Sequence, residues 1–556
     1  MDKLGRKIGM LALASGVCLA AAACNEHPLK DVSAERLTES GGTVAVTQNK
    51  DVDILFVIDN SGSMGEEQAT LAANFDAFIA QLEDSKIDAN YRIAVTTTDA
   101  NHFHCAGGED GRFQMSSCRS RPGDFQRPGT TDDFFDESCL AVCDLDSLET
   151  TPTATLLDPE MKPRPWIESI GGVTNLPEGV TATQAFQCVG PQGVSGCGYE
   201  SPLESMRRSL TRANTENEPE YGFIRPGAIL AVVFVTDEAD CSARWTDISD
   251  PWDADGERTF WSDGTDGYPR SEVCWKAGTT CQDAGGGTKE CDPANKDALG
   301  LEADDEDAVL YPVTRYTDFL QAIEDQKRAV DAAADLDTGE VLVAVIGGVP
   351  PGYTHGQEIP YRSGQTPQDV AFEAENGIAP GCRTEGIGEA VPPVRLRDFA
   401  AAFETNATNP NNLFSVCQSD YTPALENIVD LIKTQVRQAC VPVCVEDTDP
   451  LTDTIEHNCI VNEVVAGRED TLVPPCTIDD DAATVPEGSD LCYVSLSDKA
   501  NTTPATIDDL HPDCIEAGWN LQLKIVRRDG LREAPGTAIQ ATCSSSPAKS
   551  LDCPDL

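Results

Sequence analysis

One short polar segment carries oxygen donors directly after an apolar run. Asp59, Ser61 and Ser63 lie in the sequence Asp-Asn-Ser-Gly-Ser, which follows residues 52–58, an apolar run apart from Asp53. Carboxylate and hydroxyl oxygens are the ligands that hard divalent cations prefer, and Gly62 permits a tight turn between them. These residues can therefore hold a cation, for which Mg²⁺ is our first expectation and Ca²⁺ or Mn²⁺ the alternatives.

A second carboxylate follows a later apolar run. Thr236 and Asp237 come directly after residues 228–235, the most apolar run of the chain. In open α/β sheets, ligands bind beyond the carboxyl ends of the strands, so both polar segments are expected at one rim. A turn that caps the next helix is the simpler interpretation of the first segment alone. The second carboxylate favours a cation site.

The elements that must position these residues alternate along the chain. Apolar runs of strand length alternate with residues spaced three and four apart, as on one face of a helix. This alternation predicts a doubly wound, Rossmann-like, mostly parallel α/β sheet. The expected strands are residues 52–58, 91–98, 228–235, 341–346 and 413–417, and the expected helices include 66–83, one opening at 201, one through 319–330 and one through 425–436.

Long loops, and a change of sequence pattern near Cys440, divide the chain into regions. Residues of about 101–197 hold six Cys and many Gly and Pro, and residues of about 241–307 hold four Cys, four Trp and many Asp and Gly. We expect both to be insertions in an α/β domain that spans 44–439, and the second to be loop material without a core. Beyond Cys440, short apolar runs such as 460–465 and 521–526 predict a small β-rich, disulfide-bonded module over 440–556.

The N-terminal residues indicate export. A basic start precedes an uncharged apolar run over residues 8–23, which is typical of a signal peptide. Its end, Ala-Ala-Ala-Cys24, resembles the lipobox of bacterial lipoproteins, which implies cleavage before Cys24 and lipidation of that residue. Cleavage without a lipid is the alternative. A segment 1–24 is then removed, 25–43 is a polar linker, and Asn25 implies sorting to the bacterial outer membrane.

Charge and cysteine content limit the classes of partner and the compartment that we expect for the chain. Lys and Arg total 40 against 94 Asp and Glu, a formal charge of −54, which should repel nucleic acid. No later run is long enough to span a bilayer, so membrane contact is expected through the lipid alone. The 22 cysteines less Cys18 and Cys24 leave 22 − 2 = 20, which fits a disulfide framework in an exported chain.

The two polar segments resemble a known family. Asp59-x-Ser61-x-Ser63 after an apolar strand, with Thr236-Asp237 after a later one, is similar to the metal-ion-dependent adhesion site (MIDAS) of von Willebrand factor A (VWA) domains. The resemblance covers about residues 44–437 without the insertions. It implies a VWA-type fold in which these residues bind a cation and a carboxylate of the partner often completes the shell.

The chain departs from the family in two places. The family has a threonine that opens a helix, and Ser201-Pro202-Leu203 is the matching segment, so Ser201 is the implied ligand. Glu200 beside it is the alternative ligand. Glu238 stands where the family commonly has Gly, and its negative charge disfavours an acidic partner.

We expect no enzymatic activity, because the sequence lacks the metalloprotease, hydrolase and phosphate-loop motifs. Zinc at His102-x-His104-Cys105 is less favoured than a disulfide of Cys105. Asp240 and Cys241 are expected to be a loop carboxylate and a disulfide partner. The expected function is binding of an extracellular or periplasmic protein or glycan through the cation, and the alternative is a metal-independent structural or envelope-assembly protein.

Overall fold

The computed structural model describes residues 42–45, 51–84, 89–101, 108–244, 258–262, 269–330, 341–404, 411–436, 440–449, 451–452, 454–465, 469–479, 482–499, 502–528, 531 and 537–554. The expected signal segment 1–24, with its lipidation residue Cys24, lies outside the described residues. Residues 25–41 of the expected linker also lie outside them.

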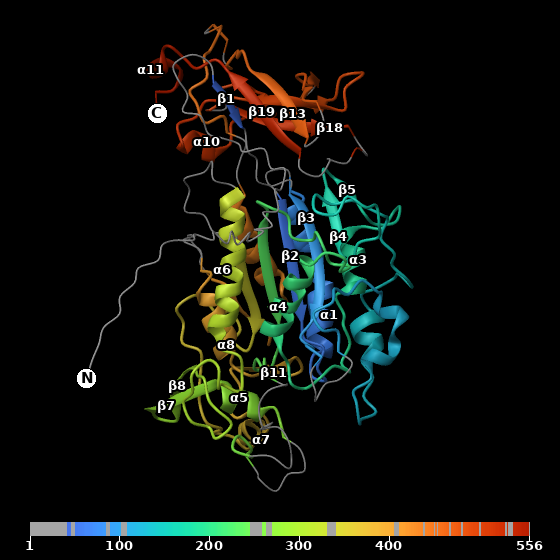
Figure 1. Cartoon of the computed structure of the whole chain (residues 1–556), viewed down its shortest axis with the longest axis vertical. Helices are drawn as coiled ribbons and strands as arrows, with labels where there is room; N and C mark the ends of the chain where they lie inside the picture. Colours follow the sequence, from blue (N-terminus) through green and yellow to red (C-terminus); the bar gives the residue numbers. More distant parts are fainter. Residues whose placement is uncertain are drawn as a thin grey trace, which may run out of the picture.

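A large sheet forms the centre of the molecule (Figure 1). It has seven strands in the order β12-β9-β6-β2-β3-β4-β5. The parallel strands are β2 (Asp51–Ile58), β3 (Asn90–Thr97), β6 (Ile229–Val235), β9 (Val341–Gly347) and β12 (Leu413–Ser415). The antiparallel strands are β4 (Ile167–Ile170) and β5 (Val173–Thr174). The fold is therefore α/β as expected, with a mixed sheet.

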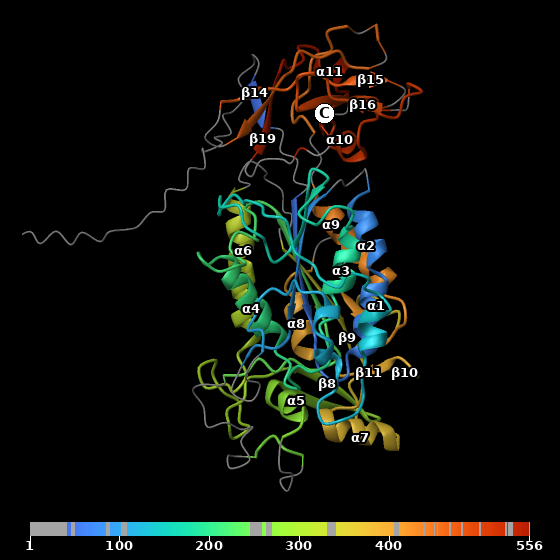
Figure 2. The same cartoon turned by 90° about the vertical axis from the view of Figure 1, so that its right-hand side faces the viewer.

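Helices cover both faces of this sheet, as Figure 2 shows. One face carries α1 (Gly65–Ala73), α2 (Phe75–Leu82), α3 (Ala182–Val189) and α9 (Thr422–Gln435). The other carries α4 (Pro202–Ala213), α6 (Val313–Val330) and α8 (Val394–Ala401). Along β2, Ile54 and Phe56 enter the first core whereas Leu55 and Val57 enter the second, because successive side chains of a strand point to opposite faces.

The single helix expected over 66–83 is instead two helices, α1 and α2, which meet at Asn74. The Asn74 side-chain oxygen accepts a hydrogen bond of 2.8 Å from the main-chain N–H of Tyr421, at the start of α9. The break therefore fastens this helix pair to a neighbour that is distant in sequence.

The first insertion is more than a loop over the sheet edge. It contributes β4 and β5, which extend the sheet beyond β3, and α3, whose Phe186 ring stacks on Phe75 at 3.5 Å between centroids. It also forms the short turns η1 (Cys118–Ser120), η2 (Pro122–Phe125) and η3 (Asp136–Leu140). These elements are short, so the sequence shows no long periodic segment for them, and they are stabilised by distant partners.

The second insertion also has elements and a core. It forms α5 (Glu272–Gly278) and the hairpin of β7 (Thr279–Gly285) and β8 (Thr288–Pro293). Trp261, Val273 and Leu310 are buried together in a separate cluster, so the expectation of loop material was wrong here. Nearby in the same end of the molecule lie α7 (Pro367–Asn376) and the hairpin of β10 (Cys382–Thr384) and β11 (Gly388–Ala390) (Figure 1).

The C-terminal part forms small sheets at the opposite end of the molecule (Figure 1). Its four-stranded sheet has the order β1-β19-β13-β14. The elements are β13 (Ile460–Val465), β14 (Thr471–Leu472), β15 (Thr477–Asp479), β16 (Ala482–Thr484), β17 (Leu491–Leu496), α10 (Pro512–Glu516), β18 (Gln522–Arg527), β19 (Thr537–Cys543) and α11 (Lys549–Asp552). β1 (Gly42–Ala45) pairs with β19, so residue 44, the expected start of the α/β domain, lies in a strand outside the large sheet.

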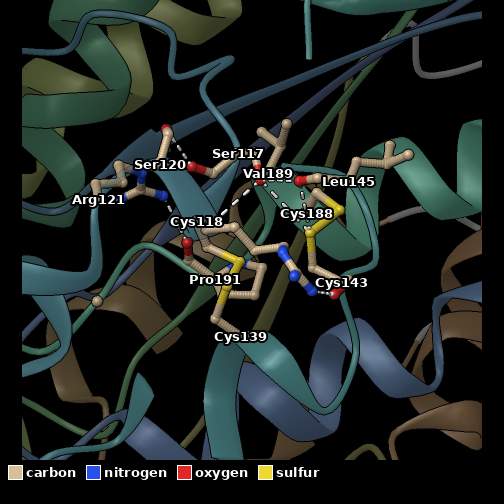
Figure 3. The surroundings of a disulfide bond; sticks show 12 residues. Ser117, Cys118, Ser120, Arg121, Cys139, Cys143, Leu145, Cys188, Val189 and Pro191 are labelled. Atoms are coloured by element: carbon tan, nitrogen blue, oxygen red, sulfur yellow. Dashed lines mark hydrogen bonds between the residues drawn. A yellow bond between two sulfur atoms is a disulfide. The ribbon is translucent and has the colours of Figure 1, made fainter. Parts of the chain in front are cut away.

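Disulfides occur in every part of the described chain, as the cysteine content predicts. Cys118–Cys139 and Cys143–Cys188 lie side by side in the first insertion (Figure 3). Further disulfides with both partners in the described ranges include Cys241–Cys274, Cys281–Cys291, Cys382–Cys417, Cys440–Cys514, Cys444–Cys553, Cys459–Cys543 and Cys476–Cys492. Such a framework fits an exported protein. None of the helices among the described residues is long and apolar enough to cross a bilayer.

Candidate functional site

The register of the parallel strands brings the two polar segments together. Ile58, the last residue of β2, is aligned with Thr97 of β3 and Val235 of β6. The main-chain N–H of Asp59 donates to the Val235 carbonyl at 2.9 Å. The residues that follow these strands therefore meet at one edge of the sheet.

The loop after β2 directs its oxygens inward. Asp59 is fully buried, and its Oδ1 accepts a hydrogen bond of 2.8 Å from the main-chain N–H of Ser61. The hydroxyl oxygens of Ser61 and Ser63 are 3.1 Å apart. Ser61 is buried whereas Ser63 is exposed, so the loop connects a buried carboxylate to the solvent.

The segment after β6 joins the same group. Thr236 Oγ1 donates a hydrogen bond of 2.5 Å to Asp59 Oδ2. Asp237 is 5% exposed, its main-chain carbonyl accepts from Val391 N at 2.7 Å, and its Oδ1 is buried without a hydrogen-bond partner among the described residues. The structure thus brings Asp59, Ser61, Ser63 and Asp237 together.

The structure separates the roles of Glu200 and Ser201. The Ser201 hydroxyl lies 3.0 Å from the Cys241 carbonyl oxygen and 3.3 Å from that of Tyr199, which are its hydrogen-bond acceptors. Glu200 instead lies beside Asp59, and burial, followed by repulsion from the Asp59 carboxylate, raises the pKa of Glu200. Its Oε2 accepts a hydrogen bond from Thr98 Oγ1, and its Oε1 has no partner within the described ranges.

Two further acidic residues complete the cluster, and neither was predicted as a ligand. Glu67 of α1 is 3% exposed and its Oε2 is buried without a described partner. Glu238 follows Asp237, and its main-chain N–H donates to Thr236 Oγ1 at 3.1 Å. Glu67 lies in the first turn of α1, four residues before the buried Leu71, so its place on the inner face of the helix was a signal that the sequence offered.

Thr98 was also missed. It directly follows β3, and its main-chain N–H donates to the Ile58 carbonyl at 3.2 Å. The rule that pointed to Asp59 and Asp237, which is that residues just beyond parallel strands share one rim, applies equally to Thr98. Its hydroxyl orients Glu200.

Burial and mutual repulsion perturb all of these carboxyl groups. Burial, followed by repulsion from Asp59, raises the pKa of Asp237 to about 8, although a hydrogen bond from Ser63 opposes the shift. Burial, followed by repulsion from Asp237, raises the pKa of Glu67 to about 9. The pKa values of Asp59, Glu200 and Glu238 are raised as well, with burial as the largest cause. A carboxylate cluster of this kind is costly to ionise without a compensating positive charge.

The chemistry of the donor set fits a divalent cation. The donors are carboxylate and hydroxyl oxygens, which Mg²⁺, Ca²⁺ and Mn²⁺ prefer. Glu67, Glu200 and Asp237 each have a buried oxygen without a hydrogen-bond partner among the described residues, and the charge of Asp59 acts on all three. A positive charge beside Asp59 would relieve this repulsion.

The less favoured candidates have other roles or lie elsewhere. Cys241 is bonded to Cys274, as expected. Asp240, the expected loop carboxylate, is buried and forms an ion pair of 2.8 Å with Arg395. His102, His104 and Cys105 lie outside the described residues.

No family model matches the chain, and no curated protein matches it. Among solved structures, it is similar to two crystal structures of the pilus adhesin SpaC from Lactobacillus rhamnosus GG, one of them in an open conformation, at 10% identity. Their TM-scores are 0.27 and 0.26, and the matches cover 91% of this chain and 41% and 42% of the adhesin chains. The chain thus spans about two fifths of the adhesin's length. So loose a superposition defines neither the fold type nor the function of this chain.

Proposed function

We propose that this chain is a cell-envelope binding protein with a VWA-type domain, which holds a divalent cation at a MIDAS-like site and binds a partner there. The observation that carries the proposal is the meeting of Asp59 and Asp237 at one rim, with an orphaned oxygen on Asp237. Mg²⁺ is the proposed cation, with Ca²⁺ or Mn²⁺ as alternatives.

The chain's own residues have distinct parts in this proposal. Asp59, Ser61, Ser63 and Asp237 hold the cation, and Glu200 is the additional carboxylate. Ser201 keeps the Cys241 segment in place through its hydroxyl group. Thr236 and Thr98 donate to Asp59 and Glu200 and so fix the orientation of those carboxylates. A divalent cation bound there would compensate the negative charge of the acidic cluster, and it could also coordinate an oxygen atom of the partner.

The proposed partner is an extracellular or periplasmic protein or glycan. It would approach the site from the side of the loop on which Ser63 is exposed. No enzymatic step is proposed. The proposed location is the bacterial outer membrane, through a lipid on Cys24. Asp59 and Asp237 lie close together at one rim of the sheet. This arrangement supports cation-dependent binding of a partner rather than a metal-independent structural role, because buried carboxylate oxygens without a hydrogen-bond partner are costly in a purely structural site.

Calorimetric titration of the purified chain with Mg²⁺, Mn²⁺ and Ca²⁺ tests the cation site. Asp59→Ala and Asp237→Asn should abolish binding. Asp76→Asn, which removes an exposed carboxylate from α2, is the matched control and should bind as the wild type does. A wild-type chain that binds none of these ions would refute the proposal and favour the metal-independent alternative.

Capture of a partner is the second test. The immobilised chain should retain a protein or glycan from a native envelope extract in Mg²⁺ and release it in chelator, and Asp59→Ala should retain nothing above background. Equal capture by the wild type with and without chelator would contradict cation-dependent binding.

A further inference from the structure

The first insertion covers the loop that carries the proposed cation ligands. A Cβ atom built on Gly65 would lie 2.5 Å from the Phe134 ring, so that ring packs directly on the main chain of the loop. Ser138 Oγ also donates a hydrogen bond of 2.5 Å to the Gly65 carbonyl. Residues 125–139, the covering segment, thus form part of the surface around the site.

The covering segment is held rigidly. Cys139 is bonded to Cys118, and Arg121 beside it donates hydrogen bonds of 2.9 and 2.6 Å to the carbonyls of Gln192 and Pro191, as Figure 3 shows for Pro191. The disulfide and these hydrogen bonds fix where the segment presents its side chains.

Arg127 is a residue of the covering segment that lies against the ligand loop. A Cβ built on Gly62, between Ser61 and Ser63, would lie 2.8 Å from Arg127 Nε. The main-chain N–H of Arg127 donates to the Asp132 carbonyl at 3.0 Å, which holds the turn. The side chain therefore lies across the loop at the point where the site meets the solvent.

The guanidinium group of Arg127 is available to a ligand. Its side chain is exposed, and within the described ranges no hydrogen bond or ion pair engages it. Its positive charge acts on Asp237, where it opposes the rise in pKa that burial causes. Neighbouring arginines of the insertion differ, because Arg121 and Arg119 are paired with Asp124 and Asp146.

We propose that Arg127 is a specificity-determining residue that binds a carboxylate group of the partner beside the proposed cation. This inference rests on the proposed function and names the ligand chemistry of the same site. A guanidinium group matches a carboxylate in a two-point hydrogen-bonded pair, and neutral sugar hydroxyls would leave its charge uncompensated. Arg127 also offsets the repulsion that Glu238 would exert on an acidic partner.

Water-proton relaxation of the Mn²⁺-loaded chain measures this directly, because a ligand that displaces water from bound Mn²⁺ lowers the relaxation enhancement. The probes are N-acetyl-glutamate amide, which represents an acidic side chain, and glucuronate, which represents an acidic glycan. N-acetyl-glutamine amide is the neutral match. Both carboxylates, or one of them, should lower the enhancement, and the better probe identifies the source of the carboxylate.

Arg127→Ala should weaken carboxylate binding by about tenfold, the loss of one charge-assisted pair. Its Mn²⁺ affinity should be unchanged or slightly higher, because a positive charge beside the cation is removed. Arg127→Lys should be intermediate, since it keeps the charge without the two-point geometry. Arg112→Ala is the matched control: Arg112 is an exposed arginine of the same insertion that pairs with Glu218, beyond the C-terminal end of α4.

The outcomes separate this inference from the proposed function. Intact Mn²⁺ binding with the same carboxylate affinity in Arg127→Ala and wild type would overturn the role of Arg127 alone. Equal binding of the glutamate and glutamine probes would overturn the carboxylate chemistry. A wild-type chain that binds no Mn²⁺ would overturn the proposed function and this inference with it.

Discussion

Thr236 donates its hydroxyl hydrogen to Asp59 at 2.5 Å, across 177 residues of sequence. This hydrogen bond satisfies one oxygen of a fully buried carboxylate and opposes the rise in its pKa that burial causes. It also ties the ends of β2 and β6, which lie side by side in the sheet. The loop that carries the candidate ligands is therefore fixed by a neighbour in the sheet.

Thr236→Val should destabilise the chain by about 2 kcal/mol, because a hydrogen bond to a buried charged group is lost. Without that bond the pKa of Asp59 rises, so protons compete more strongly with a cation and Mg²⁺ affinity at neutral pH should fall. Thr236→Ser keeps the hydroxyl and is the control. Urea unfolding and calorimetric titration measure the two effects, and equal behaviour of the valine and serine variants would contradict this role.

The acidic cluster predicts a particular pH dependence of stability in chelator. In the unfolded chain Asp and Glu titrate near about 4, whereas the folded chain raises the pKa of Asp237 to about 8 and of Glu67 to about 9. The folded state thus binds these protons more tightly. The stabilisation is fully present below about pH 4 and is lost as the pH rises towards 8 and 9.

Thermal unfolding from pH 5 to 9 checks this sign. For the chelated chain, this cluster should lower the melting temperature as the pH rises, and Asp237→Asn should flatten the curve because it cannot ionise. Saturating Mg²⁺ should reduce the fall, since the cation replaces the protons and stabilises the folded state. The same pH profile with and without Mg²⁺ would argue against a cation at these carboxylates.

Gln68 of α1 joins the site to the first insertion. Its Nε2 donates to the carbonyls of Asp59 and Gly193 at 2.7 and 2.8 Å, and its Oε1 accepts from the N–H groups of Gln192 and Gly193 at 2.7 and 3.0 Å. Gln68→Ala leaves these buried main-chain groups unpaired and should cost on the order of 3 kcal/mol.

Amide hydrogen exchange can locate the effect of Gln68→Ala. Faster exchange should be confined to residues near 192–193 and the loop after Asp59. Thr70→Ala removes an exposed side-chain hydrogen bond to Glu66 on the same helix and should change stability by less than about 0.5 kcal/mol. Unchanged exchange near residue 193 in Gln68→Ala would show that the insertion is held by other contacts.

Local sequence patterns predicted the central strands and the rim they share. β6 is a continuous apolar run, and so is β2 apart from Asp51 and Asp53. Such runs identify buried parallel strands regardless of their partners. Because parallel strands in register end at one edge, the meeting of Asp59 with Thr236 and Asp237 follows from strand position alone.

The side chains that complete the site depend on packing that no local pattern encodes. The choice between Glu200 and Ser201 is set by the Cys241 carbonyl, which takes the serine hydroxyl and leaves the glutamate to face Asp59. Arg127 reaches Gly62 because a disulfide-bonded segment folds back over the loop. Contacts of this kind join distant segments, so a single sequence gives no periodic signal for them.

Phe186 shows why the first insertion could not be recognised as part of the core, and it gives a direct test. It lies on α3, which has eight residues, and its ring packs on Phe56 and Phe75 of the α/β core at 5.1 and 3.5 Å between centroids. Phe186→Ala should therefore destabilise the central sheet by about 3–5 kcal/mol. Met161→Ala, which removes a side chain that is 65% exposed in the same insertion, should change stability by less than about 0.5 kcal/mol. Chemical unfolding followed by circular dichroism compares the two variants. If Phe186→Ala were as stable as Met161→Ala, the packing of the first insertion on the α/β core would contribute little to stability. The hydrogen bonds of Gln68 to residues 192 and 193 would then have to hold the insertion at the candidate site without help from that packing.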